Sequence, residues 1–219
     1  MKIADEIKFD FQRAERIGFD EAVLCQGKAD EQLAEILGQA RARKTSLLLT
    51  RLSVAQFDAL PSALRKATDY EPLSRTAYFG PLPRKAAPSR TAIVAAGTSD
   101  AFVFREIQRV MRFYGHESTL FADVGMAAMW RLMERIEEIR KLPVTIVVAG
   151  MDAALITAVG GLVSGVCIGV PTSTGYGVAT GGSAALHAGL ASCAPGVTLV
   201  NIDNGYGAAC AAIRALRSK

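Results

Sequence analysis

Residues 144–177, VTIVVAGMDAALITAVGGLVSGVCIGVPTSTGYG, hold two short apolar runs, and each run leads into a turn that contains Gly. The runs VTIVVA (144–149) and VCIGV (166–170) have the length of strands, and neither shows the alternation of a half-exposed strand. Continuous apolar strands are typical of a parallel sheet that is covered on both faces. With a helix-like run between them, they predict one β-α-β unit of such a sheet.

The same pattern extends outward on both sides of this stretch. Strands are predicted at 91–96 (TAIVAA), 117–121 and 197–201, and helices from residue 100 to about 114, from about 127 to 141, and after the later strands. Strands that alternate with helices predict an α/β fold, with a parallel sheet and helices on both faces.

A Pro-rich basic segment, PLPRKAAPSR (81–90), precedes this region and predicts a linker. The part before it predicts helices at 3–17, 29–43 and 53–67, the last with Ser53 as its N-cap, and strands at 22–25 and 46–50. We therefore predict a small α/β N-terminal domain over 1–80, a linker over 81–90 and a larger α/β domain over 91–219.

Composition argues against several classes of protein. The chain has 219 residues and a formal net charge of +4, and its basic residues are interspersed with acids, so no basic stripe predicts nucleic-acid binding. The N-terminus lacks the apolar run of a signal peptide, and the apolar stretch 153–170 is broken by glycines and lacks basic or aromatic flanks, which argues against a membrane span. Four separated cysteines without a C-x-x-C pair argue against a disulfide framework and a zinc cluster. We expect a cytoplasmic protein that binds neither nucleic acid nor membrane.

Residues 153–202 contain no Asp, Glu, Lys or Arg; Asp152 stands immediately before them and Asp203 immediately after. Such a segment cannot bind an anion with basic side chains of its own. Its Gly-rich turns can do so with backbone N–H groups, as can helix N-termini. The segment therefore predicts the core of an enzyme that binds a phosphate-bearing small molecule.

In a parallel sheet of this kind, ligands bind at the carboxyl ends of the strands. The loops there are AGTSD (96–100), DVGM (123–126), AGMD (149–152), PTSTGYG (171–177) and NIDNGYG (201–207). The GTSD turn can bind a phosphate or carboxylate with its backbone, or can simply cap the following helix. The GYG run lacks the spacing of a dinucleotide fingerprint and is better interpreted as part of a backbone-lined pocket. Asp100, Asp123 and Asp152 are candidates for acid–base chemistry or for holding Mg²⁺, and each can equally be a helix cap.

Cys193, in SCAPG (192–196), follows the predicted end of a helix and precedes the fifth strand. It is a candidate nucleophile, although most free cysteines are inert packing residues. Cys167 and Cys210 are predicted to be packing residues, and Cys25 remains undecided. His187 is assigned no role, since a single His on an Ala-rich helix is more often packing.

Several longer motifs resemble those of the LarB family, the carboxylase/hydrolase of nickel-pincer nucleotide biosynthesis. They are AGTSD, DVG-x-A-x-x-x-R, VVAGM, AVGGLV, VPTS-x-GYG, GG-x-AAL, SCAPGV and VNIDNGYGAA. Upstream, Arg13, Arg16, Gly18, Glu21, Gly27 and Lys28 are similar to the family's N-terminal region. The GTSD turn and Arg131 are also similar to the related aminoimidazole ribonucleotide carboxylases. The chain has Asp152 where the LarB family usually has Glu, and Trp130 where it usually has His.

The resemblance implies a flavodoxin-like, AIR-carboxylase-like catalytic domain after the linker and an octamer-like homo-oligomer. The implied reaction carboxylates the pyridinium ring of nicotinic acid adenine dinucleotide at C5 with CO₂ and cuts the phosphoanhydride, which gives the biscarboxylate mononucleotide and AMP. Cys193 is the implied nucleophile, and Asp152 is implicated beside it. The residues expected to bind substrate are Gly97, Thr98, Ser99, Asp100, Asp123, Arg131, Gly150, Ser173, Gly175, Tyr176, Gly177, Asp203 and Asn204. No resident metal or cofactor is expected, and Mg²⁺ for the hydrolysis step is left open.

Three alternatives stay open beside this hypothesis. The chain can be a carboxylase or mutase for an aminoimidazole ribonucleotide, whose substrate is already an enamine and needs no thiol. It can be a LarB paralogue that acts on another pyridinium nucleotide. It can also be a non-catalytic nucleotide-binding module that uses the GYG loop.

Overall fold

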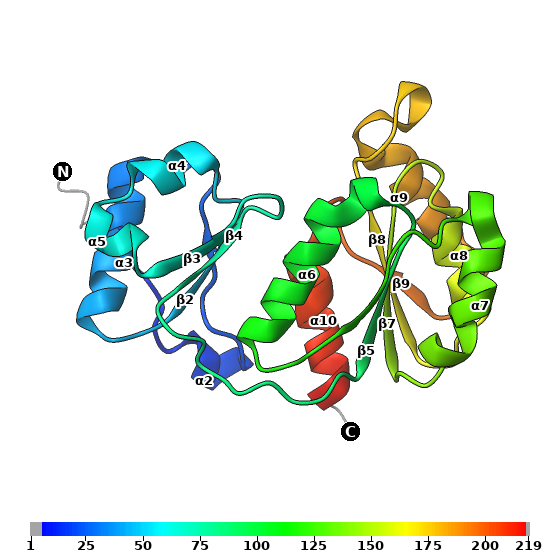
Figure 1. Ribbon diagram of the computed structural model, residues 1–219, viewed down its shortest axis with the longest axis horizontal. Helices are drawn as coiled ribbons and strands as arrows, with labels where there is room; N and C mark the ends of the chain where they lie inside the picture. The colour runs from blue at the N-terminus through cyan, green and yellow to red at the C-terminus, as the bar shows by residue number, and fades with distance from the viewer. Residues whose placement is uncertain (1–5, 218–219) are drawn as a thin grey trace. The chain divides into compact units, whose positions relative to one another are not determined.

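The computed structural model describes residues 6–217 and divides into two compact units, Met1–Lys85 and Ala86–Lys219 (Figure 1). The division falls within the segment 81–90, whose composition predicts a linker. Each unit has its own sheet, its own helices and its own buried core.

A four-stranded mixed sheet forms the centre of the first unit, in the order β1-β2-β4-β3. Its strands are β1 (Val23–Leu24), β2 (Leu47–Thr50), β3 (Thr68–Glu71) and β4 (Thr76–Phe79). β1 pairs with β2 in parallel, and the other pairs are antiparallel. This unit also contains the helices α2 (Arg13–Ile17), α3 (Asp30–Ala42), α4 (Val54–Ala59) and α5 (Ser62–Arg65). The buried face of α3 belongs to the core of this unit.

The helix predicted over 53–67 is wrong in its second half. It begins as expected, because the Ser53 Oγ accepts a hydrogen bond from the Gln56 N–H at 3.2 Å. It ends at Ala59, because Pro61 cannot donate the backbone hydrogen bond that a continuous helix needs. The chain then resumes as the short helix α5.

The helix predicted over 3–17 is also too long, and residues 3–5 of it lie outside the described part of the chain. Residues 7–10 are not helical, and a helix forms again at Arg13–Ile17. Ile7 and Phe9, two residues apart, pack against the core of the unit, which is the period of an extended chain. The β3–β4 hairpin is not predicted from the sequence. Polar residues such as Asp69 and Glu71 interrupt the apolar pattern that would indicate a strand.

Five parallel strands form the sheet of the second unit, in the order β6-β5-β7-β8-β9. They are β5 (Thr91–Ala95), β6 (Thr119–Phe121), β7 (Val144–Ala149), β8 (Val166–Pro171) and β9 (Val197–Leu199). Every residue of β5 and β7 is buried, as expected for central strands covered on both faces. The order is that of flavodoxin-like folds, and the direction of strand progression reverses between β5 and β7.

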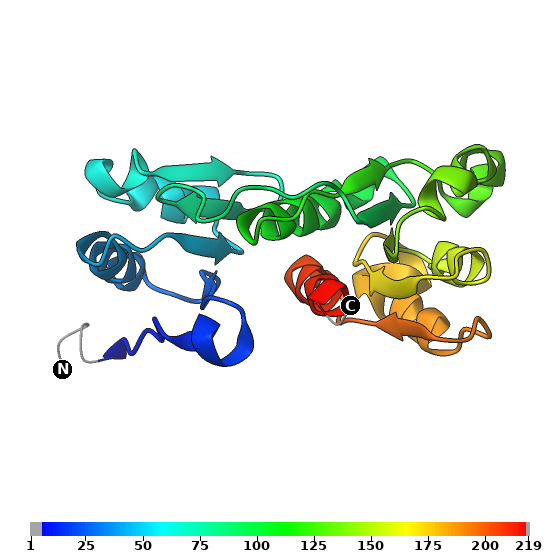
Figure 2. The same ribbon diagram turned by 90° about the horizontal axis from the view of Figure 1, so that it is seen from below.

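The helices of the second unit cover both faces of its sheet. On one face, α6 (Ala101–Phe113) and α10 (Gly205–Arg217) lie side by side (Figures 1 and 2). On the other face lie α7 (Met129–Ile139), α8 (Ala154–Gly160) and α9 (Ser183–Leu190). Short 3-10 turns, η1 (Thr98–Asp100), η2 (Met126–Ala128) and η3 (Gly177–Gly182), precede α6, α7 and α9. This arrangement confirms the predicted fold class.

Within residues 6–217, the helices are too short or too polar for any of them to cross a membrane.

Gly125 allows the loop after β6 to lie close against the end of β5. A Cβ at this position would stand 2.7 Å from the carbonyl oxygen of Ala96, which is a backbone atom. We expect Gly125→Ala to destabilise the second unit by about 1–3 kcal/mol, because the neighbouring backbone has to shift. Chemical denaturation followed by circular dichroism measures this. Gly161→Ala is the matched control, since its Cβ would meet nothing closer than 3.6 Å; equal losses in both variants would contradict the packing argument.

Candidate functional site

The loops at the carboxyl ends of the five strands are joined by hydrogen bonds into one surface. The loop after β5 is tied to the loop after β8, because the Thr172 hydroxyl donates to Asp100 Oδ1 at 2.7 Å. The loop after β8 is tied in turn to the loop after β9, because the Ser173 N–H donates to Asp203 Oδ1 at 2.8 Å. Loops from strands that are far apart in the sequence are thus held in one fixed arrangement.

The remaining two loops join the same surface through their backbones. The Met151 N–H, after β7, donates to the Thr174 carbonyl at 2.8 Å. The Val124 N–H, after β6, donates to the Ala95 carbonyl at 3.1 Å. All five loops that the sequence predicts at this edge therefore lie next to one another, on both sides of the point where the strand order reverses.

Asp100 is the buried acid of this surface, with 2% of its area exposed. Its Oδ1 accepts from Thr172, and its Oδ2 accepts from the Gly97 N–H at 3.1 Å. Burial raises the pKa of the Asp100 carboxyl. The hydrogen bonds from Thr172 and Gly97 lower this pKa in part, and the nearby Asp203 carboxylate raises it further. The side chain thus orients the GTSD turn from within the protein, while Thr98 and Ser99 of the same turn are exposed at the start of α6.

Strained backbone gathers on these loops. Four non-glycine residues with left-handed backbone conformations lie here: Asp123 (φ 58°), Met151 (φ 55°), Ala153 (φ 50°) and Asp203 (φ 54°). A conformation of this kind costs on the order of 1–3 kcal/mol and persists only where the surroundings enforce it, as they do at active sites and ligand clamps. The concentration of strain at one edge of the sheet marks this edge as the candidate site.

Asp123 and Arg131 form an ion pair beside the first turn of α7. The Arg131 guanidinium donates to the Asp123 carboxylate and, at 3.2 Å, to the Asp123 carbonyl oxygen. The guanidinium carbon lies 5.5 Å from the centre of the Trp130 ring. The structure therefore links two residues that the sequence predicts for substrate binding and places an exposed aromatic side chain next to them.

Asp152 is exposed at the start of α8, directly after Gly150 and Met151. The N-cap of α8 is Ala153, and the Asp152 Oδ1 accepts a hydrogen bond at 3.3 Å from the N–H of Ala154, the first residue of the helix. Gly150 leaves no room for a side chain, because a Cβ there would stand 2.6 Å from the Thr172 Oγ1. Asp152 therefore lies one residue before the cap position that the sequence left open, and its carboxylate is exposed to solvent.

The Gly-rich loop after β8 projects beyond the carboxyl ends of the strands, and η3 is seen there above the sheet in Figure 1. Gly175 is half-buried, whereas Tyr176 and Gly177 are exposed, Tyr176 to 78%. In the neighbouring loop, the Asn204 Oδ1 accepts from the Gly207 N–H at 2.8 Å and so caps α10. These residues supply a surface of backbone and neutral side chains.

Cys193 does not join this surface within one chain. It lies between α9 and β9, and therefore at the amino end of β9, whereas the five loops lie at the carboxyl ends of the strands. Beside it, the Ser192 hydroxyl accepts a hydrogen bond from the Thr157 hydroxyl of α8 at 2.8 Å. The six residues of β8 span about 20 Å, which is the order of the separation between the two edges of the sheet.

The four cysteines differ in exposure. Cys193 is exposed. Cys210, which the sequence predicts as a packing residue, is only half-buried. Cys25 and Cys167 are buried, and burial raises the pKa of Cys25 to about 12 and that of Cys167 to about 11. In residues 6–217, no three His, Cys, Asp or Glu side chains are grouped as a metal ion would require.

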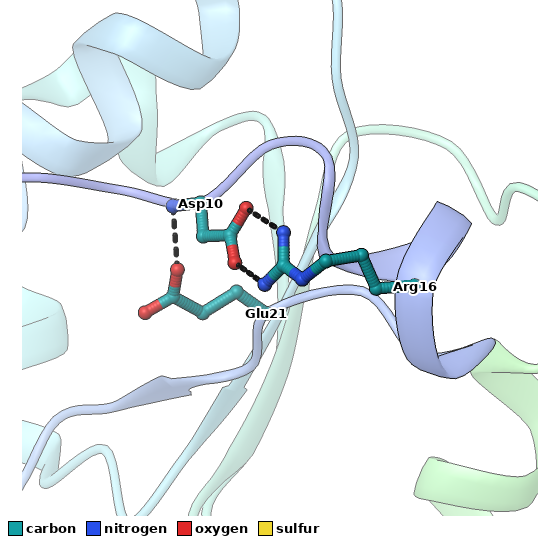
Figure 3. Close-up of polar contacts among 3 residues, drawn as sticks. All are labelled: Asp10, Arg16 and Glu21. Atoms are coloured by element: carbon teal, nitrogen blue, oxygen red, sulfur yellow. Dashed lines mark hydrogen bonds and ion pairs between the residues drawn. The ribbon is translucent and has the colours of Figure 1, made fainter.

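The N-terminal residues Arg16 and Glu21 hold local structure in the first unit. The Arg16 guanidinium forms an ion pair with the Asp10 carboxylate, and the Glu21 carboxylate accepts from the Asp10 N–H at 2.6 Å (Figure 3). Asp10 thereby fixes the extended segment that leads into α2.

Sequence reasoning missed the two threonines that join the loops, Thr172 and Thr174. Threonine in a Gly-rich turn is unremarkable in a sequence, and the partners of Thr172 and Thr174 lie more than seventy residues away. The available signal is position, because Thr172 directly follows a fully apolar strand and is itself completely buried.

Comparison with known proteins agrees with this fold. The family model described as "LarB/PurE-like N-terminal domain" matches residues 2–81. "Uncharacterized protein MJ0165" of Methanocaldococcus jannaschii is 31% identical over 216 residues, which cover 94% of this chain and 82% of that protein. The crystal structure of a Treponema denticola PurE2 variant is similar with a TM-score of 0.50 and 21% identity over 60% of this chain and 80% of that one, a likeness of fold.

The fold and these matches define an α/β protein of the flavodoxin-like, AIR-carboxylase-like class. The chain belongs to the LarB/PurE-like family. Membership of this family indicates an enzyme of the carboxylase type.

The raised pKa of Asp100 predicts a pH dependence of stability. The folded state holds the proton of Asp100 more tightly than the unfolded chain does, so this contribution is complete below the unfolded pKa of about 4 and is lost as pH rises through the folded value. Asp100→Asn does not titrate, and its amide can still accept from Gly97 and donate to the Thr172 hydroxyl. We expect the melting temperature of the variant, relative to that of the parent, to rise as pH increases above about 4. A difference that does not change with pH would contradict this account.

Exposure predicts which thiol reacts first. We expect one fast reaction with iodoacetamide at neutral pH, at Cys193, and much slower reaction at Cys25 and Cys167, because only the thiolate is nucleophilic. Peptide mass spectrometry over a time course identifies the site. Cys193→Ser removes the fast phase, whereas early modification of Cys25 or Cys167 would show that the core opens readily.

Proposed function

We propose that the chain carboxylates the pyridinium ring of nicotinic acid adenine dinucleotide at C5 and hydrolyses the phosphoanhydride, giving pyridinium-3,5-biscarboxylic acid mononucleotide and AMP. The observation that carries the proposal is the exposed thiol of Cys193 in a chain of the LarB/PurE-like family. A thiol is the group that this substrate needs, because a pyridinium ring is electron-poor and cannot itself attack CO₂.

A thiolate from Cys193 converts the ring into a nucleophile. The sulfur adds to C4, and the resulting dihydropyridine contains an enamine whose C5 carries electron density. C5 attacks the carbon of CO₂, so a C–C bond forms and the ring nitrogen becomes an iminium. A base removes the C5 proton, which restores the enamine, and the thiolate then leaves from C4 as the ring becomes aromatic again. The atoms balance without an oxidant or a reductant.

The loops at the carboxyl edge suit the anionic parts of this substrate. Thr98 and Ser99 of the GTSD turn are exposed, as are Tyr176 and Gly177 of the GYG run. Their backbone N–H groups are the proposed binding positions for phosphates and a carboxylate. Asp152, exposed beside them, is positioned to serve as the base or to orient the hydrolytic water. The low charge of the region favours exclusion of water, which helps the weakly hydrated CO₂. Mg²⁺ remains a candidate for the hydrolysis step only.

Because Cys193 and these loops lie at opposite edges of one chain's sheet, we propose that the site is shared between copies in a homo-oligomer. Reacting atoms have to approach to about 3–3.5 Å, and a separation on the order of a strand length cannot be closed by side-chain motion. The exposed hydrophobic residues of the second unit, among them Val178 (98% exposed) and Leu190 (67%), support association with another copy.

Product analysis tests the reaction. The purified chain is incubated with nicotinic acid adenine dinucleotide and bicarbonate, and AMP and a doubly carboxylated mononucleotide are sought by mass spectrometry. We expect Cys193→Ala to reduce turnover by roughly a thousandfold or more, as loss of a nucleophile does elsewhere. Cys210→Ala is the matched control and should retain activity. Turnover that survives Cys193→Ala would favour chemistry that needs no thiol, such as that on an aminoimidazole ribonucleotide, and dinucleotide binding without turnover would favour a binding module.

Mixed oligomers test whether the site is shared. Cys193→Ala and Asp152→Asn chains are each expected to be inactive, and their co-expression should restore activity, because about a quarter of the sites then combine an intact thiol with an intact carboxylate. Activity assays on the co-purified mixture, with each single variant as control, measure the rescue. Absence of rescue in a mixture of confirmed composition would contradict a shared site.

A further inference from the structure

Trp130 is the only tryptophan of the chain, and it is 60% exposed on the first turn of α7. Its neighbours Met129 (52%) and Met133 (46%) are exposed as well. A large aromatic ring left in solvent is unfavourable, and exposed apolar groups that cluster usually mark a binding surface. The beginning of α7 lies directly after the loop of β6, at the edge of the sheet that carries the candidate site.

Arg131 fixes the position of this ring relative to the site. Its guanidinium carbon lies 5.5 Å from the centre of the Trp130 ring, within the range of a cation–π contact. The same guanidinium donates to the carbonyl and carboxylate of Asp123, a residue with a left-handed backbone at the site. Trp130 is therefore held against the structure of the site, although most of its surface is free.

The loop that carries Asp123 lies against the GTSD turn. Val124 is hydrogen-bonded to Ala95 at the end of β5, and Gly125 approaches the carbonyl of Ala96, the residue before Gly97. The indole thus belongs to the same rigid edge as the exposed Thr98 and Ser99.

We propose that Trp130 is a stacking surface for the flat heteroaromatic ring of a nucleotide bound at this edge. The inference rests on the proposed function for the class of ligand. The charge pattern supports this assignment, because the Arg131 guanidinium is paired with the Asp123 carboxylate, whereas the neighbouring turn offers backbone N–H groups to a phosphate. The open face of an electron-rich indole suits a purine or a pyridinium.

The single tryptophan provides a direct test. Emission of Trp130, excited where tyrosine does not absorb, is followed while the full chain is titrated with AMP, with nicotinic acid mononucleotide, or with ribose 5-phosphate. We expect quenching by at least one of the two ring-bearing compounds and none by ribose 5-phosphate. Whichever of the two quenches identifies the ring as adenine or pyridinium.

Calorimetric titration of variants completes the test. We expect Trp130→Ala to weaken binding of the quenching nucleotide by roughly tenfold, which corresponds to about 1.4 kcal/mol, and Trp130→Phe to retain most of the affinity. Val54→Ala, an exposed apolar residue of α4 in the first unit, is the control and should leave both affinity and quenching unchanged.

Two results would overturn the proposal. One is the absence of quenching by both ring-bearing compounds. The other is blue-shifted emission without ligand together with a lower oligomer mass for Trp130→Ala, which would mean that a second copy covers the indole. The outcome is separable from the proposed reaction: quenching by AMP without carboxylation of the dinucleotide supports stacking alone, whereas turnover with an unaltered KM in Trp130→Ala supports the reaction and refutes stacking.

Discussion

In a parallel sheet every crossover must return the chain to the same edge, and the candidate site of this protein follows from that constraint. Five strands, separated by helices of the second unit, all end at one edge, so five loops from distant parts of the sequence are brought together there. The buried hydrogen bond between Thr172 and Asp100 then locks the loops of β5 and β8, which are separated in the sheet by β7. The strained backbones of Asp123, Met151, Ala153 and Asp203 can persist because this network is rigid.

The chemistry of the edge is that of a neutral surface rather than a charged one. Asp123 is neutralised by Arg131, and Asp100 is buried with a raised pKa. What remains exposed is largely backbone, hydroxyl groups and aromatic rings, with Asp152 as the exposed acid beside the Gly-rich turns. In the proposed function, this surface would hold an anionic nucleotide through backbone N–H groups, with Trp130 as an aromatic platform.

Under the proposed function, the position of Cys193 adds a second requirement. A nucleophile at the amino end of β9 can serve a site at the carboxyl ends only if it belongs to another copy. Association between copies would then be part of the chemistry, and the exposed apolar residues of the second unit would have a role in assembling the site as well as in stability.

The sequence by itself determined the architecture of the second unit, because continuous apolar runs such as 144–149 can be satisfied only in a sheet covered on both faces. It also placed the five loops at one edge, since that placement follows from parallel pairing. Local order was less well determined in the first unit, where Pro61 divides a predicted helix and the polar β3–β4 hairpin gave no signal. Only the tertiary structure decided which side chains face each other: that Asp100 is buried on Thr172, that Arg131 is bound to Asp123 beside Trp130, and that Cys193 stands at the opposite edge. Such pairings depend on distances across the sheet between residues far apart in the chain, and the periodicity of a sequence carries no information about them.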